Sequence, residues 1–78
     1  MNMIRLVIRV PKEDAAFLYW TVDALEGAAF HTTRKSPVGA THRDVELFIA
    51  PDYVDEMHTV LDELRRVGLT IELQEGII

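Results

Sequence analysis

The side chains in this chain that are able to bind a metal or transfer a proton are three histidines and 13 acidic residues. His31 falls inside an alternating segment, His42 at the base of a loop, and His58 on the flank of a helical segment. A metal site needs several ligands at one point, and no HxxH, HxH or carboxylate pattern brings them together here. We therefore expect ordinary surface or edge histidines, no metal site and no cofactor.

Catalytic chemistry has little support in the sequence. The absence of cysteine excludes disulfides, thiolate-bound zinc, iron–sulfur clusters and thiol catalysis. The acidic residues fall on helix faces or strand edges, outside any apolar pocket that shifts a pKa, and the scattered glycines form no phosphate-binding loop. We expect a non-enzymatic protein with no catalytic residue. The alternative is a small enzyme whose pocket forms between subunits and uses His31 or Arg9.

Four basic residues bracket one loop: Arg34, Lys35, His42 and Arg43. They include three of the eight Lys and Arg residues in a chain whose net charge is −5. Such a group is able to bind an anion, although a charged loop is also ordinary solvated surface. The acidic balance argues against nucleic acid, because binding to a phosphate backbone needs clustered positive charge. We keep the four residues as anion-binding candidates and expect no nucleic-acid partner.

The single tryptophan lies on the outer face of an amphipathic helical segment. Ala15, Leu18 and Val22 are spaced for one face of a helix, and at about 100° per residue Trp20 falls on the opposite side. The residues that surround Trp20 on this outer face are Ala16, Phe17 and Ala24. Burying a tryptophan removes about 150 to 250 Å² from water, an upper limit of about 4 to 6 kcal/mol. We therefore expect this face to be a contact surface.

Several partners are able to cover Trp20. Self-association is our first expectation, because a domain of 78 residues hides only about 60% of its unfolded surface and has marginal stability. The alternatives within the chain are a rotated helix, a loop over residues 34–43 that folds over the indole, and a tail over residues 77–78 that does so. A different protein partner or a small-molecule effector is the remaining alternative.

Leu25 completes the apolar pattern of this helix. The pattern recurs 39 positions later as Val54, Met57, Leu61 and Leu64. The sequence predicts helices over residues 11–26 and 51–68, with Asp52 as an N-cap, and Gly27 closing the first helix. Alternating apolar residues predict strands over residues 3–10, 28–35, 44–49 and 69–74. Ser36 to Gly39 has the pattern of a type I turn within a hairpin loop over residues 34–43.

Two strand-helix-strand units predict an α+β fold, the ferredoxin-like βαββαβ plait, as one domain over residues 1–78. Its four-stranded antiparallel sheet has the order 4-1-3-2, and both helices cover one face. Arg5 and Arg9 then share the open face with Asp44, Glu46 and Glu72, and we expect cross-strand ion pairs there. The apolar start of the chain is interrupted by both arginines, so we expect neither a signal peptide nor a membrane span, and a cytoplasmic protein.

Three junctions carry a resemblance to a known family: Val10-Pro11 into the first helix, Leu25-Glu26-Gly27 at its end, and Ala50-Pro51-Asp52 into the second. With these, the chain resembles the ACT-like domains, and in particular a family of short bacterial proteins known as a domain of unknown function. The resemblance implies pairing through sheets or helices and binding of small effectors by a glycine-containing loop after strand one. That loop has no glycine here, so the chain departs from the family pattern at the effector site, while the pairing is expected to carry over together with a small effector or a protein partner. We expect a regulatory or binding module that forms a homodimer.

Overall fold

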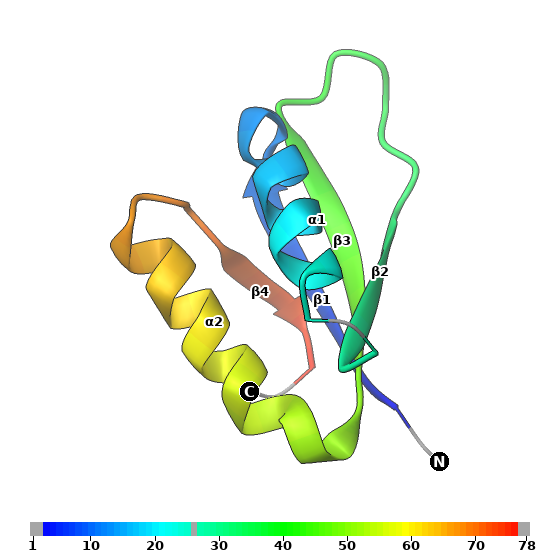
Figure 1. Cartoon of the computed structure of the whole chain (residues 1–78). Coiled ribbons are helices and arrows are strands. Elements are labelled where there is room, and N and C mark those ends of the chain that lie inside the picture. The colour runs from blue at the N-terminus through cyan, green and yellow to red at the C-terminus, as the bar shows by residue number, and fades with distance from the viewer. Residues whose placement is uncertain (1–2, 26, 77–78) are drawn as a thin grey trace.

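The computed structural model describes residues 3–25 and 27–76, which form one sheet covered on one face by two helices (Figure 1). The elements in chain order are β1 (Ile4–Pro11), α1 (Ala15–Asp23), β2 (Ala29–Thr33), β3 (His42–Ile49), α2 (Val54–Arg66) and β4 (Glu72–Glu75). Short 3-10 turns, Lys12–Asp14 and Pro51–Tyr53, precede the two helices.

The four strands lie in the order β2-β3-β1-β4, and each neighbouring pair is antiparallel. Read from the β4 edge, this is the order 4-1-3-2 that the sequence predicts. The arrangement is an α+β fold consistent with a ferredoxin-like plait.

The prediction that the two helices bury the same apolar pattern is confirmed. The helix residues buried against the sheet are Ala15, Leu18 and Val22 in α1 and Met57, Leu61 and Leu64 in α2. Leu25 and Val54, the outermost members of the two patterns, are partly buried against the same core. Spacings of three and four residues keep these side chains on one helix face, and that face packs on the inward side chains of β1 and β3.

The ends of several elements differ from the predictions. α1 ends at Asp23, before the predicted residue 26, and Glu26 itself lies outside the described residues. Gly27 adopts the predicted left-handed conformation, with φ +80°. Asp52 does not cap the second helix, because it lies within the 3-10 turn and α2 begins two residues later. A short 3-10 turn therefore replaces the predicted capped entry.

The hairpin loop is shorter than predicted and its turn is shifted. His42 and Arg43 belong to β3, where they pair with Pro11 and Val10 of β1, so the loop covers residues 34–41. The backbone N–H of Ala40 donates to the carbonyl of Pro37 at 3.1 Å, and Gly39 at the third position of this turn has φ +82°. A positive φ at that position is typical of a type II turn rather than the predicted type I turn.

The last strand is also displaced, from the predicted residues 69–74 to Glu72–Glu75. Ile71 is buried just before it, whereas Leu73 is 40% exposed despite its place in the apolar alternation. β4 lies at the sheet edge, where a side chain has a neighbouring strand on one side only, and a register shift interrupts its pairing with β1. Gly76 then approaches β1 so closely that a Cβ atom would lie 2.8 Å from the carbonyl oxygen of Arg5.

We predict that Gly76→Ala lowers the free energy of unfolding by about 2 kcal/mol or more, because both a positive φ and a backbone clash oppose the new methyl group. Gly39→Ala is the matched control, since Gly39 also has a positive φ but open space around it. Its expected cost is about 1 kcal/mol, from the backbone conformation alone. Urea unfolding measures both values, and equal costs would show that the close approach to β1 does not matter.

Candidate functional site

The α1 outer face, which we define as Ala16, Phe17, Trp20 and Ala24, is exposed along its whole length. Trp20 is 73% exposed and Phe17 46% exposed, and their rings meet edge to face with centroids 6.4 Å apart. The prediction that Trp20 points away from the core is confirmed. The expectations that a rotated helix or the hairpin loop removes Trp20 from solvent are therefore wrong. The tail over residues 77–78, the third such expectation, lies outside the described residues.

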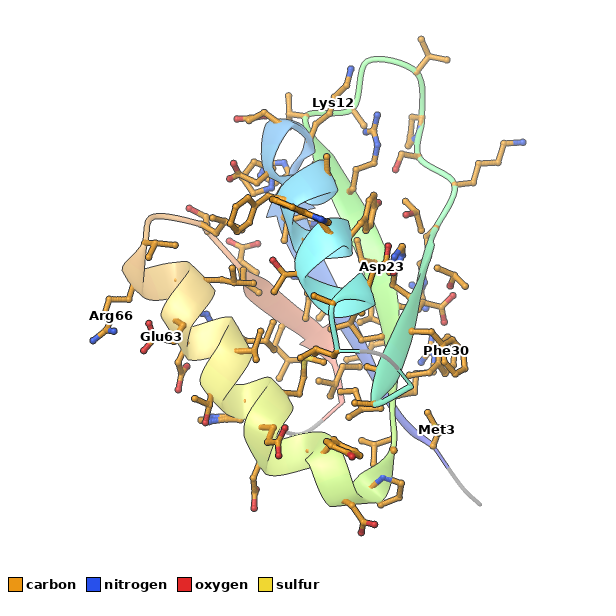
Figure 2. All side chains as sticks on the ribbon, in the orientation of Figure 1. Met3, Lys12, Asp23, Phe30, Glu63 and Arg66 are labelled. Carbon is orange, nitrogen blue, oxygen red and sulfur yellow. The ribbon has the colours of Figure 1, made fainter. Side chains whose placement is uncertain are left out.

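The two helices differ in what they present to solvent. α2 has the ordinary amphipathic pattern, and its outer residues Glu63 and Arg66 form an ion pair at 2.7 Å on the side that points away from the sheet (Figure 2). α1 presents two aromatic rings in the corresponding position. Since scattered exposed apolar residues are normal but contiguous aromatic ones mark contact sites, the α1 outer face is the first candidate site.

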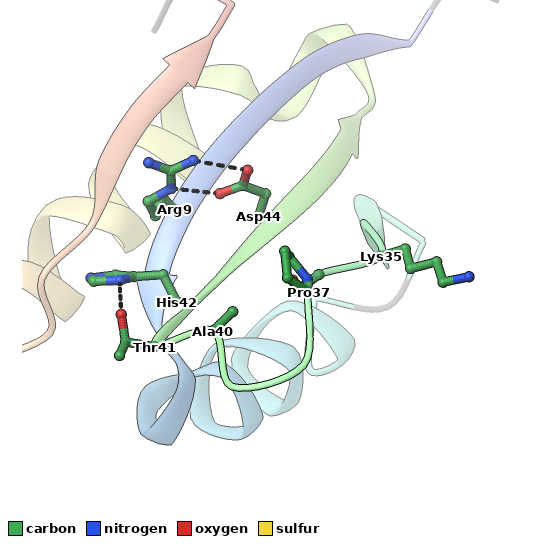
Figure 3. A pocket seen from close by; sticks show the side chains of 8 residues that line it. Arg9, Lys35, Pro37, Ala40, Thr41, His42 and Asp44 are labelled. Atoms are coloured by element: carbon green, nitrogen blue, oxygen red, sulfur yellow. Dashed lines mark hydrogen bonds and ion pairs between the residues drawn. The ribbon is translucent and has the colours of Figure 1, made fainter.

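The four anion-binding candidates do not come together. Lys35 and His42 line a hollow of about 310 Å³ beside Arg9 and Asp44 (Figure 3). Arg34 instead donates to Glu75 on the open face of the sheet, at 2.9 Å. Arg43 donates to the backbone carbonyl of its neighbour, at 3.2 Å. The loop therefore places only two of the four residues at one hollow.

One of the positive charges around this hollow is neutralised by a carboxylate. Arg9 donates from Nε and Nη2 to the two carboxylate oxygens of Asp44, at 2.8 and 3.1 Å. This bond raises the pKa of Arg9 and lowers the pKa of Asp44, so the two groups stay charged and neutralise each other. Lys35 points away from Arg9 in Figure 3, and His42 shares a hydrogen bond with Thr41. The basic side chains do not converge on one point of the hollow, and anion binding by Lys35 and His42 stays a prediction.

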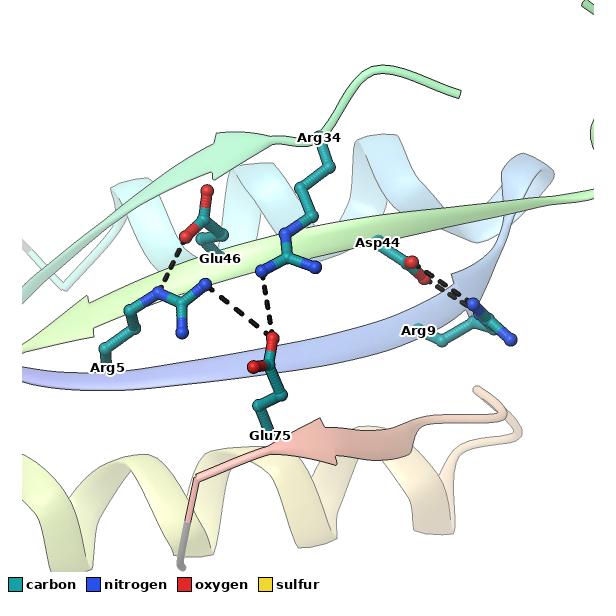
Figure 4. A network of polar contacts seen from close by, with 6 residues as sticks. All are labelled: Arg5, Arg9, Arg34, Asp44, Glu46 and Glu75. Atoms are coloured by element: carbon teal, nitrogen blue, oxygen red, sulfur yellow. Dashed lines mark hydrogen bonds and ion pairs between the residues drawn. The ribbon is translucent and has the colours of Figure 1, made fainter. Parts of the chain in front are cut away.

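A network of ion pairs covers the open face of the sheet (Figure 4). Arg5 donates to Glu46 at 2.7 Å and lies 3.7 Å from Glu75, which also accepts from Arg34. Val7, whose cross-strand partners are Glu46 and Glu75, is fully buried on this face. The prediction of cross-strand ion pairs on the open face is confirmed, and the structure gives the partners as Arg5 with Glu46 and Arg9 with Asp44.

The contact of Arg34 with Glu75 was not predicted from the sequence, because it joins a loop residue to the displaced end of β4. Glu72 lies opposite Arg9 across the β1–β4 pair, as expected for a residue of the open face.

A second feature missed from the sequence is Phe30 of β2, which stacks on Phe48 with ring centroids 5.3 Å apart. The period-two pattern of β2 places Phe30 on the open face, so this signal was available.

His31 of β2 contacts side chains of α1, so it is not an isolated edge histidine. Its ring stacks on Tyr19 at 4.5 Å, and its Nε2 lies 3.1 Å from the carboxylate of Asp23, which Figure 2 places between these elements. The hydroxyl groups of Tyr19 and Thr33 share a hydrogen bond beside it. These contacts fix the α1 helix to the edge strand β2.

Two kinds of feature are absent from residues 3–25 and 27–76, a membrane-spanning helix and a metal cluster. No helix in these ranges is long and apolar enough to span a membrane. These residues also contain no group of three or more His, Cys, Asp or Glu side chains that could hold a metal ion.

The chain matches no protein-family model, and searches of curated proteins and of solved structures found no significant match. The resemblance to the ACT-like domains therefore stays a prediction. The candidate site rests on the geometry described above.

We predict that the open-face ion pairs make stability depend on pH. Hydrogen bonds from Arg9 and Arg5 lower the pKa of Asp44 and of Glu46 in the folded state. Both pairs therefore stabilise the fold fully above the unfolded pKa values, about pH 4, and this contribution is lost as the pH falls through the lower folded values.

Asp44→Asn tests this dependence, because it removes one of the two titrating groups. Urea unfolding between pH 2 and 7 is expected to show a shallower loss of stability on acidification in Asp44→Asn than in the wild type. Asp55→Asn, which removes a carboxylate of α2 outside the open-face network, is expected to follow the wild-type curve. The prediction is wrong if Asp44→Asn and Asp55→Asn give the same pH profile.

Proposed function

We propose that this protein is a non-enzymatic binding module that forms a homodimer, with the α1 outer face as a contact surface. The observation that carries the proposal is Trp20, which is 73% exposed on the solvent side of a helix whose inner side is already filled. Because the domain is small, its own core buries little apolar surface. A second copy that covers this ring adds to the apolar surface buried.

The size of the expected gain sets limits on the dimer. Covering the exposed part of Trp20 removes on the order of 150 Å² from water, an upper limit of about 4 kcal/mol for each copy. Association of two molecules costs about 4 to 15 kcal/mol, so two tryptophans roughly balance this cost. Phe17, in contact with Trp20, adds apolar area, but a stable dimer needs contacts beyond the α1 outer face.

The rest of the proposal follows from composition and from the ion pairs. A net charge of −5 and an open face whose arginines pair with carboxylates give no basic surface for nucleic acid. The absence of cysteine suits a reducing compartment, and we place the protein in the cytoplasm. The ACT-like resemblance adds a small effector or a protein ligand at the interface as the regulatory part of the proposal. Of the two residues named for the alternative enzyme, Arg9 is paired with Asp44, and His31 is paired with Asp23 and stacked on Tyr19.

We predict that Trp20→Glu converts the dimer to a monomer without unfolding it, because the substituted side chain is mostly in solvent and a buried carboxylate at the interface lacks a partner. Light scattering measures the mass, and circular dichroism checks the fold. Val67→Glu is the matched control. Val67 is an exposed apolar residue, 67% accessible, that lies after the end of α2 and outside the α1 outer face.

The expected outcome is a halved mass for Trp20→Glu and an unchanged mass for Val67→Glu. Tryptophan fluorescence gives an independent reading, because Trp20 is the single tryptophan and its emission shifts to shorter wavelength when the ring is buried. A wild-type protein that stays monomeric, with fully hydrated emission at all concentrations, would contradict the proposed function.

A further inference from the structure

The hollow beside Arg9 and Asp44 has a positive lining in an acidic protein. Its volume of about 310 Å³ lies at the lower end of the range for small-molecule sites. The charged side chains among the described residues that line it are two cations, Arg9 and Lys35, and one carboxylate, Asp44, a net charge of +1. His42 and Ser36 add an imidazole and a hydroxyl group. Because the whole chain has a net charge of −5, this local excess of cations and donors favours a ligand that accepts hydrogen bonds.

The pair of Arg9 with Asp44 leaves one nitrogen of the guanidinium available. Nε and Nη2 of Arg9 donate to the two carboxylate oxygens of Asp44, at 2.8 and 3.1 Å. Within residues 3–25 and 27–76, Nη1 makes no hydrogen bond, and Glu72, opposite Arg9 in β4, forms no ion pair with it. Each oxygen of Asp44 already accepts a bond, and the guanidinium beside it repels a second cation. The pair therefore suits an acid rather than a zwitterion with an ammonium group.

His42 supplies a second donor on the side of Arg9. The register between β1 and β3 makes His42 a diagonal neighbour of Arg9 on the open face of the sheet. The hydroxyl of Thr41 shares a hydrogen bond of 2.8 Å with Nδ1 of His42, and Nε2 has no partner among the described residues. When that hydroxyl donates, Nε2 carries the proton of the neutral imidazole and is a donor. Arg9 and His42 together suit one carboxylate group.

The second cation lies across the hollow. Figure 3 shows Lys35 on the side opposite Arg9 and His42, with Pro37 and Ala40 of the loop between them. Lys35 is exposed, and its four-carbon stem is flexible enough to turn the ammonium group toward a bound anion. A compact anion with one charged group contacts one side of the hollow only. An extended molecule with a carboxylate at each end contacts both sides.

We propose that this hollow binds a small aliphatic dicarboxylate. One carboxylate accepts hydrogen bonds from Arg9 and His42, and the other pairs with Lys35. The short carbon chain between them packs on Pro37 and Ala40. The inference rests on the effector part of the proposed function and gives it a ligand class and a site. It does not depend on the homodimer, because α1 covers the opposite face of the sheet (Figure 1).

Titration of the wild-type chain with succinate, followed by amide chemical shifts in NMR, tests this inference. Succinate carries two carboxylates, acetate and inorganic phosphate each carry one anionic group, and succinamide is the neutral analogue. Succinate is expected to shift the amides of residues 40–44 with a dissociation constant at least tenfold lower than that of acetate or phosphate. Succinamide is expected to cause no shift. The inference is overturned if succinate causes no shift, or binds no more tightly than acetate.

Three single substitutions assign the contacts. Lys35→Met and His42→Gln each remove one exposed group of the hollow, and each is expected to raise the dissociation constant of succinate at least fivefold. Lys35→Met is also expected to remove the preference for succinate over acetate, because the second carboxylate loses its cation. Arg43→Gln is the matched control, since Arg43 adjoins the same loop but donates to a backbone carbonyl and does not line the hollow. Equal weakening by Arg43→Gln and Lys35→Met would show unspecific charge attraction and overturn the inference.

The variant Trp20→Glu separates this inference from the proposed homodimer. It leaves the hollow unchanged, so it is expected to bind succinate with the wild-type constant. A monomeric wild-type chain that binds succinate overturns the homodimer and supports the dicarboxylate site. A dimer that does not bind succinate overturns the site and leaves the homodimer standing. Loss of succinate binding in a folded Trp20→Glu would place the ligand at the dimer interface and overturn the site in the hollow.

Discussion

The packing of two helix faces on one sheet face is the constraint on which the other features depend. Ala15, Leu18 and Val22 occupy the inner side of α1, and the matching residues of α2 occupy the rest of the same layer. Once this layer is filled, no position on the core side is left for the indole of Trp20. The ring is therefore left outside by the same spacing that builds the core, and the domain reaches its fold with a large apolar side chain in solvent.

The open face of the sheet is built differently from the face under the helices. It has no helix to cover it, and charged side chains take the place of a second apolar layer. Arg5 and Arg34 meet Glu75 from opposite sides, and the surrounding network leaves Val7 without exposed surface. Surface ion pairs contribute little each, but mutual pairing also removes the free positive charge that a polyanion needs. This face therefore carries paired charges over a buried valine, with Phe30 exposed beside them.

Within residues 3–25 and 27–76, the α1 outer face and the outer edge of β2 have no partner inside the molecule. They are neighbours because the ring of Tyr19 and the carboxylate of Asp23 bind His31, which ties α1 to the edge strand. They face different directions, because Trp20 points away from the sheet and the edge of β2 lies in the plane of the sheet.

The sequence by itself determined the periodic features: both helices, all four strands, their order in the sheet, and the outward direction of Trp20. These follow from spacing along the chain, which sets the side of a helix or strand on which each residue lies. Tertiary structure decided what depends on neighbours. His42 and Arg43 became strand residues because β1 continues opposite them, and the group of four basic residues separated because Arg34 found Glu75, a residue 41 positions away. Such partners are fixed by the register between strands, which local spacing does not record.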